Sequence, residues 1–156
     1  TCALPIFREV EQWLKFHPAA FSEIYYARTI NNIYFDTLGF SNYYDNVEGE
    51  TDRLKVRIRW YGELKGLIER PILEYKIKKG LLGKKESYPL LPFQLGQHLN
   101  RTSILSALES CPLVVKNFVA GFQPVLLNRY QRRYFLSADK QFRITIDHDL
   151  SHTVVF

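Results

Sequence analysis

Hydrophobic and polar residues alternate strictly over residues 53–60, and this alternation is the clearest structural signal in the chain. Because successive side chains of a strand point to opposite faces, a period of two predicts a β-strand here. One face of that strand is entirely cationic, with Arg53, Lys55, Arg57 and Arg59. The other face is apolar, with Leu54, Val56, Ile58 and Trp60.

Residues 72–78 repeat the alternation and predict a second strand. Its polar face carries Glu74, Lys76 and Lys78, opposite an apolar face with Leu73, Tyr75 and Ile77. We expect Gly80 and Gly83 to form a flexible loop that carries Lys84 and Lys85.

Weaker patterns predict the remaining elements. Apolar residues at helical spacing predict helices over 7–16, 97–110 and 113–122, with a break between the last two at Pro112. Strands are expected over 32–37, 125–136 and 142–147, with a polar loop from residue 38 to Gly49 and a turn over 137–140. Asp36 and Thr37 are expected to end a strand. The four tyrosines Tyr25, Tyr26, Tyr43 and Tyr44 are expected to pack in the core and loops rather than form a base-stacking platform. Strands without regular alternation with helices favour an antiparallel α+β fold.

The composition is that of one globular domain over residues 1–156, with 46% hydrophobic, 15% aromatic and 24% charged residues. No apolar run is long enough for a membrane span and no signal peptide is visible, so we expect a soluble, cytoplasmic chain. Cys2 and Cys111 and the four histidines lack metal-ligand spacing.

The net charge of +5 is concentrated in one segment. Residues 53–85 hold eleven Lys and Arg against three Glu, so the rest of the chain is slightly acidic. A local basic island favours a specific anionic ligand over general adhesion to nucleic acid or membrane.

For a single strand with one cationic face, the ordinary alternative is an outer sheet face exposed to solvent. Several strands with charged faces, among them the strands with Arg132 and Arg143, favour instead a curled sheet with a basic interior and its apolar faces packed outward on helices. Such an interior suits a polyanion, because Arg binds phosphate oxygens bidentately and carboxylates hold Mg²⁺ or Mn²⁺.

At these residues the sequence resembles the VTC domain, a polyphosphate polymerase module of the triphosphate tunnel (CYTH-like) superfamily. The matching segments lie in the family's order over residues 30 to 150. They are Ile33-Tyr34-Phe35-Asp36-Thr37, the loop from Asn42-Tyr43 to Gly49, residues 53–62 ending in Arg59-Trp60-Tyr61-Gly62, Leu73-Glu74-Tyr75-Lys76, Arg129-Tyr130-Gln131-Arg132-Arg133 and Arg143-Ile144-Thr145-Ile146-Asp147.

The resemblance implies an antiparallel β tunnel or barrel with a basic interior, flanked by a few helices, and a divalent ion, Mn²⁺ or Mg²⁺, as cofactor. It implies transfer of the γ-phosphate of ATP to a growing polyphosphate chain, so that ATP and polyphosphate are the expected partners and nucleic acid is not. The implied catalytic residues are Arg57, Arg59, Lys76, Arg132 and Arg143. Further phosphate-binding residues are expected at Arg53, Lys55, Lys78, Lys84, Lys85 and Tyr130. Glu74 and Asp147 are the candidate metal ligands.

The sequence also departs from the family. The Glu and Lys motifs expected in the first and last strands are missing, so we expect an incomplete tunnel from a fragment truncated at both ends. Residues 1–7, whose start resembles translated adaptor sequence, are expected to be non-native, and the principal metal carboxylate of the family is expected to be missing from this chain.

Two alternative functions stay open at this level. The same tunnel hydrolyses triphosphates in CYTH-like triphosphatases, and a domain without metal carboxylates would bind or sense polyphosphate without turnover. A nucleic-acid-binding sheet is disfavoured, because Trp60 and Tyr75 fall on the face opposite the cations.

Overall fold

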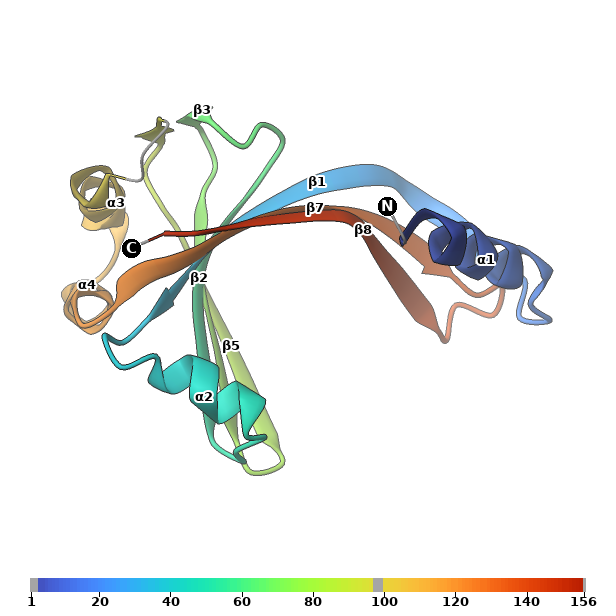
Figure 1. Cartoon of the computed structure of the whole chain (residues 1–156), viewed down its shortest axis with the longest axis horizontal. Coiled ribbons are helices and arrows are strands. Elements are labelled where there is room, and N and C mark those ends of the chain that lie inside the picture. Colours follow the sequence, from blue (N-terminus) through green and yellow to red (C-terminus); the bar gives the residue numbers. More distant parts are fainter. Residues whose placement is uncertain (1–2, 97–99, 156) are drawn as a thin grey trace. The chain divides into compact units, whose positions relative to one another are not determined.

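The computed structural model describes residues 3–96 and 100–155, and side chains from residue 6 onward. The start of the helix expected at residue 97, together with Cys2 and His98, lies outside the described residues. In chain order the elements are α1 (Ala3–Phe16), β1 (Ser22–Asp36), α2 (Ser41–Val47), β2 (Arg53–Tyr61), β3 (Gly66–Ile68), β4 (Ile72–Lys79), β5 (Leu82–Pro89), β6 (Phe93–Leu95), α3 (Arg101–Ala107), a 3-10 turn (Leu108–Ser110), α4 (Leu113–Ala120), β7 (Gln123–Leu136) and β8 (Arg143–Val154) (Figure 1).

The strands form one six-stranded sheet and one small sheet. The six-stranded sheet has the order β5-β4-β2-β1-β7-β8, and β3 pairs with β6 in the small sheet. The pairs β2–β4, β4–β5 and β3–β6 are antiparallel. The prediction of an α+β fold with an antiparallel sheet and flanking helices is therefore confirmed. In the described part of the chain β5 and β8 are edge strands, so this sheet is not closed into a barrel.

The chain divides into two compact units. The first unit contains the residues up to Ile30 together with Arg129–Ser151, and the second contains Asn31–Asn128 and the residues from His152 onward. The strands β1, β7 and β8 each have residues in both units. We describe each unit by itself.

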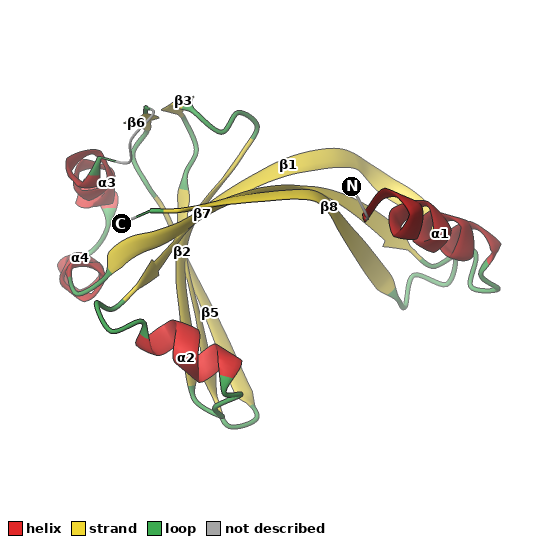
Figure 2. Cartoon of the chain, in the orientation of Figure 1, coloured by secondary structure: helices red, strands yellow, loops and turns green. Residues whose placement is uncertain are grey.

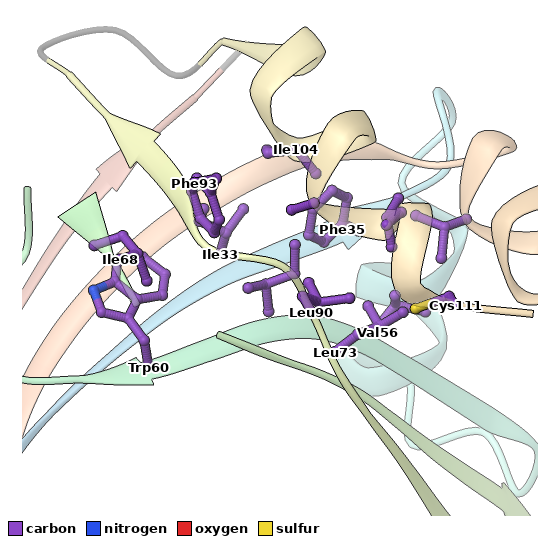
Figure 3. Packing of buried hydrophobic residues seen from close by; sticks show 14 of the residues in the cluster. Ile33, Phe35, Val56, Trp60, Ile68, Leu73, Leu90, Phe93, Ile104 and Cys111 are labelled. Atoms are coloured by element: carbon purple, nitrogen blue, oxygen red, sulfur yellow. The ribbon is translucent and has the colours of Figure 1, made fainter. Parts of the chain in front are cut away.

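The core of the second unit is built on the apolar faces of its strands. Val56, Ile58 and Trp60 of β2 are buried, as are Leu73 and Tyr75 of β4. Helices α3 and α4, which lie beside these strands in Figure 2, contribute their own buried residues to the same cluster. Those helical residues are Ile104, Ala107, Val115 and Val119. Figure 3 shows the cluster, with Cys111 packed among the apolar side chains. The alternation thus correctly predicts which face of each strand meets the helices.

In the first unit, Arg133 of β7 connects the helix α1 to the strands. Its guanidinium donates to both carboxylate oxygens of Glu23 at 2.8 and 2.7 Å and pairs with Glu11 of α1. The ring of His148 of β8 lies 4.4 Å from the ring of Phe7 of α1, and Leu14 of α1 is buried.

No helix among the described residues is long and apolar enough to cross a membrane.

Several of the predicted helices, strands and loops differ from those in the structure. The expected loop before Gly49 contains helix α2, because Asp36 accepts hydrogen bonds from the backbone amides of Asn42 and Tyr43 and so fixes the first turn. The expected flexible loop with Lys84 and Lys85 is mostly strand β5, which pairs with β4 across a tight turn at Gly80. The strand expected from residue 32 begins at Ser22, and the short strands β3 and β6 were not expected. In β5 and the first part of β1 most residues are exposed to solvent, which weakens the alternation of apolar and polar residues. Strands β3 and β6 are three residues long, too short for a period to be recognised.

The tyrosine prediction is also wrong for the side chains concerned. Tyr43 and Tyr44 of α2 are 58% and 52% exposed, and Tyr25 and Tyr26 of β1 are exposed as well. The rings of Tyr43 and Tyr44 stay uncovered because α2 is only seven residues long, and those of Tyr25 and Tyr26 because the first part of β1 is largely exposed.

Candidate anion-binding site

Strand register brings the cations of β2 and β4 together. Arg57 lies directly opposite Glu74, Lys55 opposite Lys76, and Arg53 opposite Lys78. Because directly opposite residues share a face of the sheet, all six side chains belong to one surface. The next strand adds Lys85, which lies opposite Lys76.

The buried carboxylate of Glu74 is the centre of this surface. Arg57 donates to its Oε2 atom through Nε at 2.7 Å and Nη2 at 2.6 Å. Lys85 Nζ lies 2.6 Å from the other oxygen, Oε1, and Arg59 Nη1 lies 3.8 Å from Oε2. Only 5% of the Glu74 side chain is exposed, against 50% of that of Lys85. We call Arg57, Arg59, Lys76, Lys85 and Glu74 the Glu74 cluster.

The ionisation of the cluster follows from this arrangement. Burial by itself would raise the pKa of Glu74, but the hydrogen bond from Lys85 and the charge of Arg57 hold that pKa below its ordinary value. Burial likewise opposes the charge of Arg57, yet its hydrogen bonds to Tyr34 and Glu74 raise its pKa. Desolvation, followed by repulsion from Arg57 and Arg59, lowers the pKa of Lys76. The cluster therefore gathers four basic side chains around one carboxylate, so basic groups outnumber acidic ones in it.

A row of polar side chains from β1 holds the two arginines. Arg57 Nη1 donates to the Tyr34 hydroxyl at 3.3 Å, and Arg59 Nε donates to Asn32 Oδ1 at 3.1 Å. Asn32 is fully buried and its amide donates to Asn128 Oδ1 of β7 at 2.8 Å. These bonds fix the guanidinium planes before any ligand arrives.

Sequence reasoning missed Asn32, Tyr34 and Asn128 as parts of the site. A signal was present, since Asn32, Tyr34 and Asp36 alternate with the apolar Ile33 and Phe35. That period of two places the three polar residues on one face of β1, as it does for the cations of β2. The pairing of β1 with β2 decides which of these three residues contacts an arginine, and the residue pattern does not predict that pairing.

The other predicted cations of the second unit differ in position. Lys55 is exposed and lies two residues before Arg57 on the same face, and Arg53 and Lys78 extend that face further. Lys84 lies opposite Ile77, on the other face of the sheet, and its ammonium pairs with Glu86 at 2.6 Å. Lys84 is therefore outside the Glu74 cluster, although Lys85 next to it is a member.

The remaining predicted residues belong to the first unit. Arg132 forms two hydrogen bonds of 2.6 Å with the two carboxylate oxygens of Asp147, and its guanidinium lies 5.2 Å from the centre of the Tyr130 ring. The bond to Asp147 raises the pKa of Arg132. Arg143 is exposed on β8. Phosphate contacts by Tyr130, Arg132 and Arg143 stay predictions.

The two candidate metal ligands are engaged elsewhere. Glu74 gives both its oxygens to cations, and Asp147 gives both of its oxygens to Arg132. Among the described residues no group of three or more His, Cys, Asp or Glu side chains is placed to hold a metal ion. In this arrangement neither carboxylate fits as the primary ligand of a divalent ion.

Comparison with protein families identifies the fold that carries this site. The sequence pattern of the VTC domain matches residues 4–154, which is nearly the whole chain. The chain belongs to the VTC domain family. The match covers β1, β2 and β4, which build the Glu74 cluster, and also the strands with Arg132 and Arg143. VTC membership supports a function related to polyphosphate. In a comparison with curated proteins, none matches the chain.

Proposed function

We propose that this VTC domain is a polyphosphate polymerase, which transfers the γ-phosphate of ATP to a growing polyphosphate chain. The observation that carries the proposal is the excess of positive charge around one buried carboxylate in the Glu74 cluster. Cations that repel one another in this way bind a polyanion with a gain in free energy, because the anion relieves their repulsion.

The chemistry of phosphoryl transfer agrees with such a site. The transition state needs little covalent help from the protein, and positioning and charge neutralisation supply most of the rate enhancement. Arg57 and Arg59 present planar guanidinium groups that bind phosphate oxygens in pairs, and Lys76 adds a point charge beside them. Tyr34 and Asn32 hold the two guanidinium groups in place.

A divalent cofactor, Mn²⁺ or Mg²⁺, is part of the proposal. Such an ion would neutralise part of the phosphate charge if it were bound. Mg²⁺ usually keeps several waters and takes one or two protein carboxylates together with substrate phosphates as its ligands. Because Glu74 and Asp147 are both paired with cations, we assign no step of the reaction to an ion held by them.

Binding of tripolyphosphate tests the site separately from turnover. Calorimetric titration is carried out on the unchanged chain and on the Lys76→Gln and Arg59→Gln variants. A hydrogen bond to a charged group contributes about 1.5–3 kcal/mol, so we expect each variant to lose roughly tenfold or more in affinity. Lys84→Gln is the matched control, since it removes the same charge from the other face, and its affinity should change little.

Products of ATP with Mn²⁺ or Mg²⁺ then distinguish the functions. Chains longer than three phosphates support the polymerase, and release of orthophosphate alone indicates a triphosphatase. Binding without turnover indicates a sensor of polyphosphate. Equal losses for Lys84→Gln and Lys76→Gln, or no binding by the unchanged chain, would contradict the proposed site.

A further inference from the structure

A large cavity in the second unit opens beside the Glu74 cluster. Its volume is about 630 Å³, which lies within the range of small-molecule sites. It is lined by the end of β1, by α2, by part of β2, by the start of β7 and by Val154 of β8. Every lining residue belongs to the second unit.

Most of the wall is aromatic or aliphatic. The rings that line it are Tyr34, Phe35, Phe40, Tyr43 and Tyr44. Tyr43 and Tyr44 are more than half exposed, and their ring centres lie 5.4 Å apart in a T-shaped arrangement. Exposed tyrosine rings of this kind provide stacking surfaces for flat aromatic ligands such as nucleobases.

Two residues connect the cavity to the Glu74 cluster. Tyr34 lines the cavity and its hydroxyl accepts a hydrogen bond from Arg57. Lys55 also lines the cavity and lies two residues before Arg57 on one face of β2, a spacing of about 7 Å. A ligand with an aromatic part in the cavity would therefore direct an attached chain of phosphates toward Arg57.

We propose that this cavity binds the nucleoside part of a nucleoside triphosphate, with the base stacked on one ring of the Tyr43–Tyr44 pair and in edge contact with the other. The inference rests on the proposed function, because it assigns the phosphates of the same molecule to the Glu74 cluster. Its ligand has both properties that the neighbouring surfaces require, an aromatic group and several negative charges. An apolar peptide lacks the charges, and inorganic tripolyphosphate lacks the ring.

The test compares ATP with tripolyphosphate on the same proteins. Stacking on an aromatic side chain contributes enough free energy to change affinity by about tenfold per base. We expect the unchanged chain to bind ATP about tenfold more tightly than its Tyr43→Ala/Tyr44→Ala variant does. Tripolyphosphate should bind the two proteins equally. Tyr43→Phe/Tyr44→Phe retains the rings and should restore ATP binding, and Tyr26→Ala removes an exposed tyrosine of the first unit and should have no effect.

The outcomes separate the two proposals. If the alanine variant binds ATP as well as the unchanged chain does, the nucleoside site is wrong while the phosphate site stands. If both ligands lose affinity equally and the thermal midpoint falls, the tyrosines act through folding and the nucleoside site is also wrong. If the unchanged chain binds neither ligand, both the proposed function and this inference are overturned.

Discussion

Glu74 illustrates how one residue can both stabilise a site and compete with its ligand. In the free protein its carboxylate is the counter-ion of Arg57 and Lys85. A phosphate that binds these cations must share or replace that carboxylate. Glu74 is therefore expected to favour folding and to weaken anion binding, which is opposite to the expectation for a metal ligand.

Glu74→Gln tests this role. Removing one partner of a buried ion pair leaves uncompensated charge and costs about 3–5 kcal/mol, so we expect a large fall in the free energy of unfolding of the free protein. Tripolyphosphate should bind the variant several-fold more tightly in the absence of metal, and should recover part of the lost stability. Denaturant unfolding with and without the ligand measures both effects. Weaker metal-free binding by the variant would contradict the counter-ion role.

The free energy of unfolding of the unchanged chain and of Glu74→Gln, measured against pH, tests whether the ionised Glu74 carboxylate stabilises the fold. The pKa of Glu74 is lower in the folded protein than in the unfolded chain. Its contribution to stability is therefore present above the unfolded pKa of about 4.3 and is lost as the pH falls through the folded pKa. Below that range the unchanged chain and Glu74→Gln should approach equal stability, and a difference that persists there would indicate a packing effect.

At the scale of elements, period-two alternation correctly predicts the strands that form the site. It does not predict the helix α2 in the connection between strands. In β2 and β4 each face meets one environment, either the core or the cluster, so the pattern of residue types is clean and both strands are confirmed. In β5 and the first part of β1 both faces are largely exposed, and the pattern disappears. Helix α2 is held by the long-range acceptor Asp36 rather than by an apolar periodicity, so its sequence alone does not reveal it.

The candidate site follows the same division. The cationic face of β2 and its partner Lys76 can be read from the sequence, because charge alternation is a local property. The exclusion of Lys84 from the Glu74 cluster depends on the register of β4 with β5, and the bond between Arg59 and Asn32 depends on the meeting of β1 with β2. These pairings join strands that are distant in the sequence, and the residue pattern within one strand does not predict them.

Asp36 links strand β1 to helix α2 and permits a test at this scale. Its carboxylate accepts three backbone amides, from Thr37 at 2.7 Å, Asn42 at 3.0 Å and Tyr43 at 2.9 Å. Loss of such a cap costs about 0.5–2 kcal/mol. We expect Asp36→Ala to release α2 and to lower ATP affinity severalfold while tripolyphosphate affinity is kept.

The control for this prediction is Asp45→Ala, which removes another carboxylate near α2 without removing the cap. Hydrogen exchange of the α2 amides should increase in Asp36→Ala and remain unchanged in the control. Equal losses of ATP and tripolyphosphate affinity in Asp36→Ala would mean that the change reaches the Glu74 cluster itself.

At the scale of the whole molecule, the two units carry different parts of the predicted phosphate-binding set. The second unit contains the Glu74 cluster, and the first contains Arg132 and Arg143. Arg132 is neutralised by the two hydrogen bonds to Asp147, whereas the cluster keeps an excess of positive charge. The electrostatic argument for anion binding is therefore stronger for the second unit taken alone.

Hydrogen exchange with saturating tripolyphosphate tests both units in one experiment. A ligand at 100 times its dissociation constant stabilises the state that binds it by about 2.7 kcal/mol, so amides that exchange only through unfolding of that region should slow by about 100-fold. We expect this protection in β2 and β4, with little change in α1. The family resemblance predicts additional protection around Arg132 and Arg143, and its absence would remove these two residues from the site. Protection in β7 and β8 without any in β2 and β4 would instead mean that the charge excess at Glu74 does not determine where the anion binds.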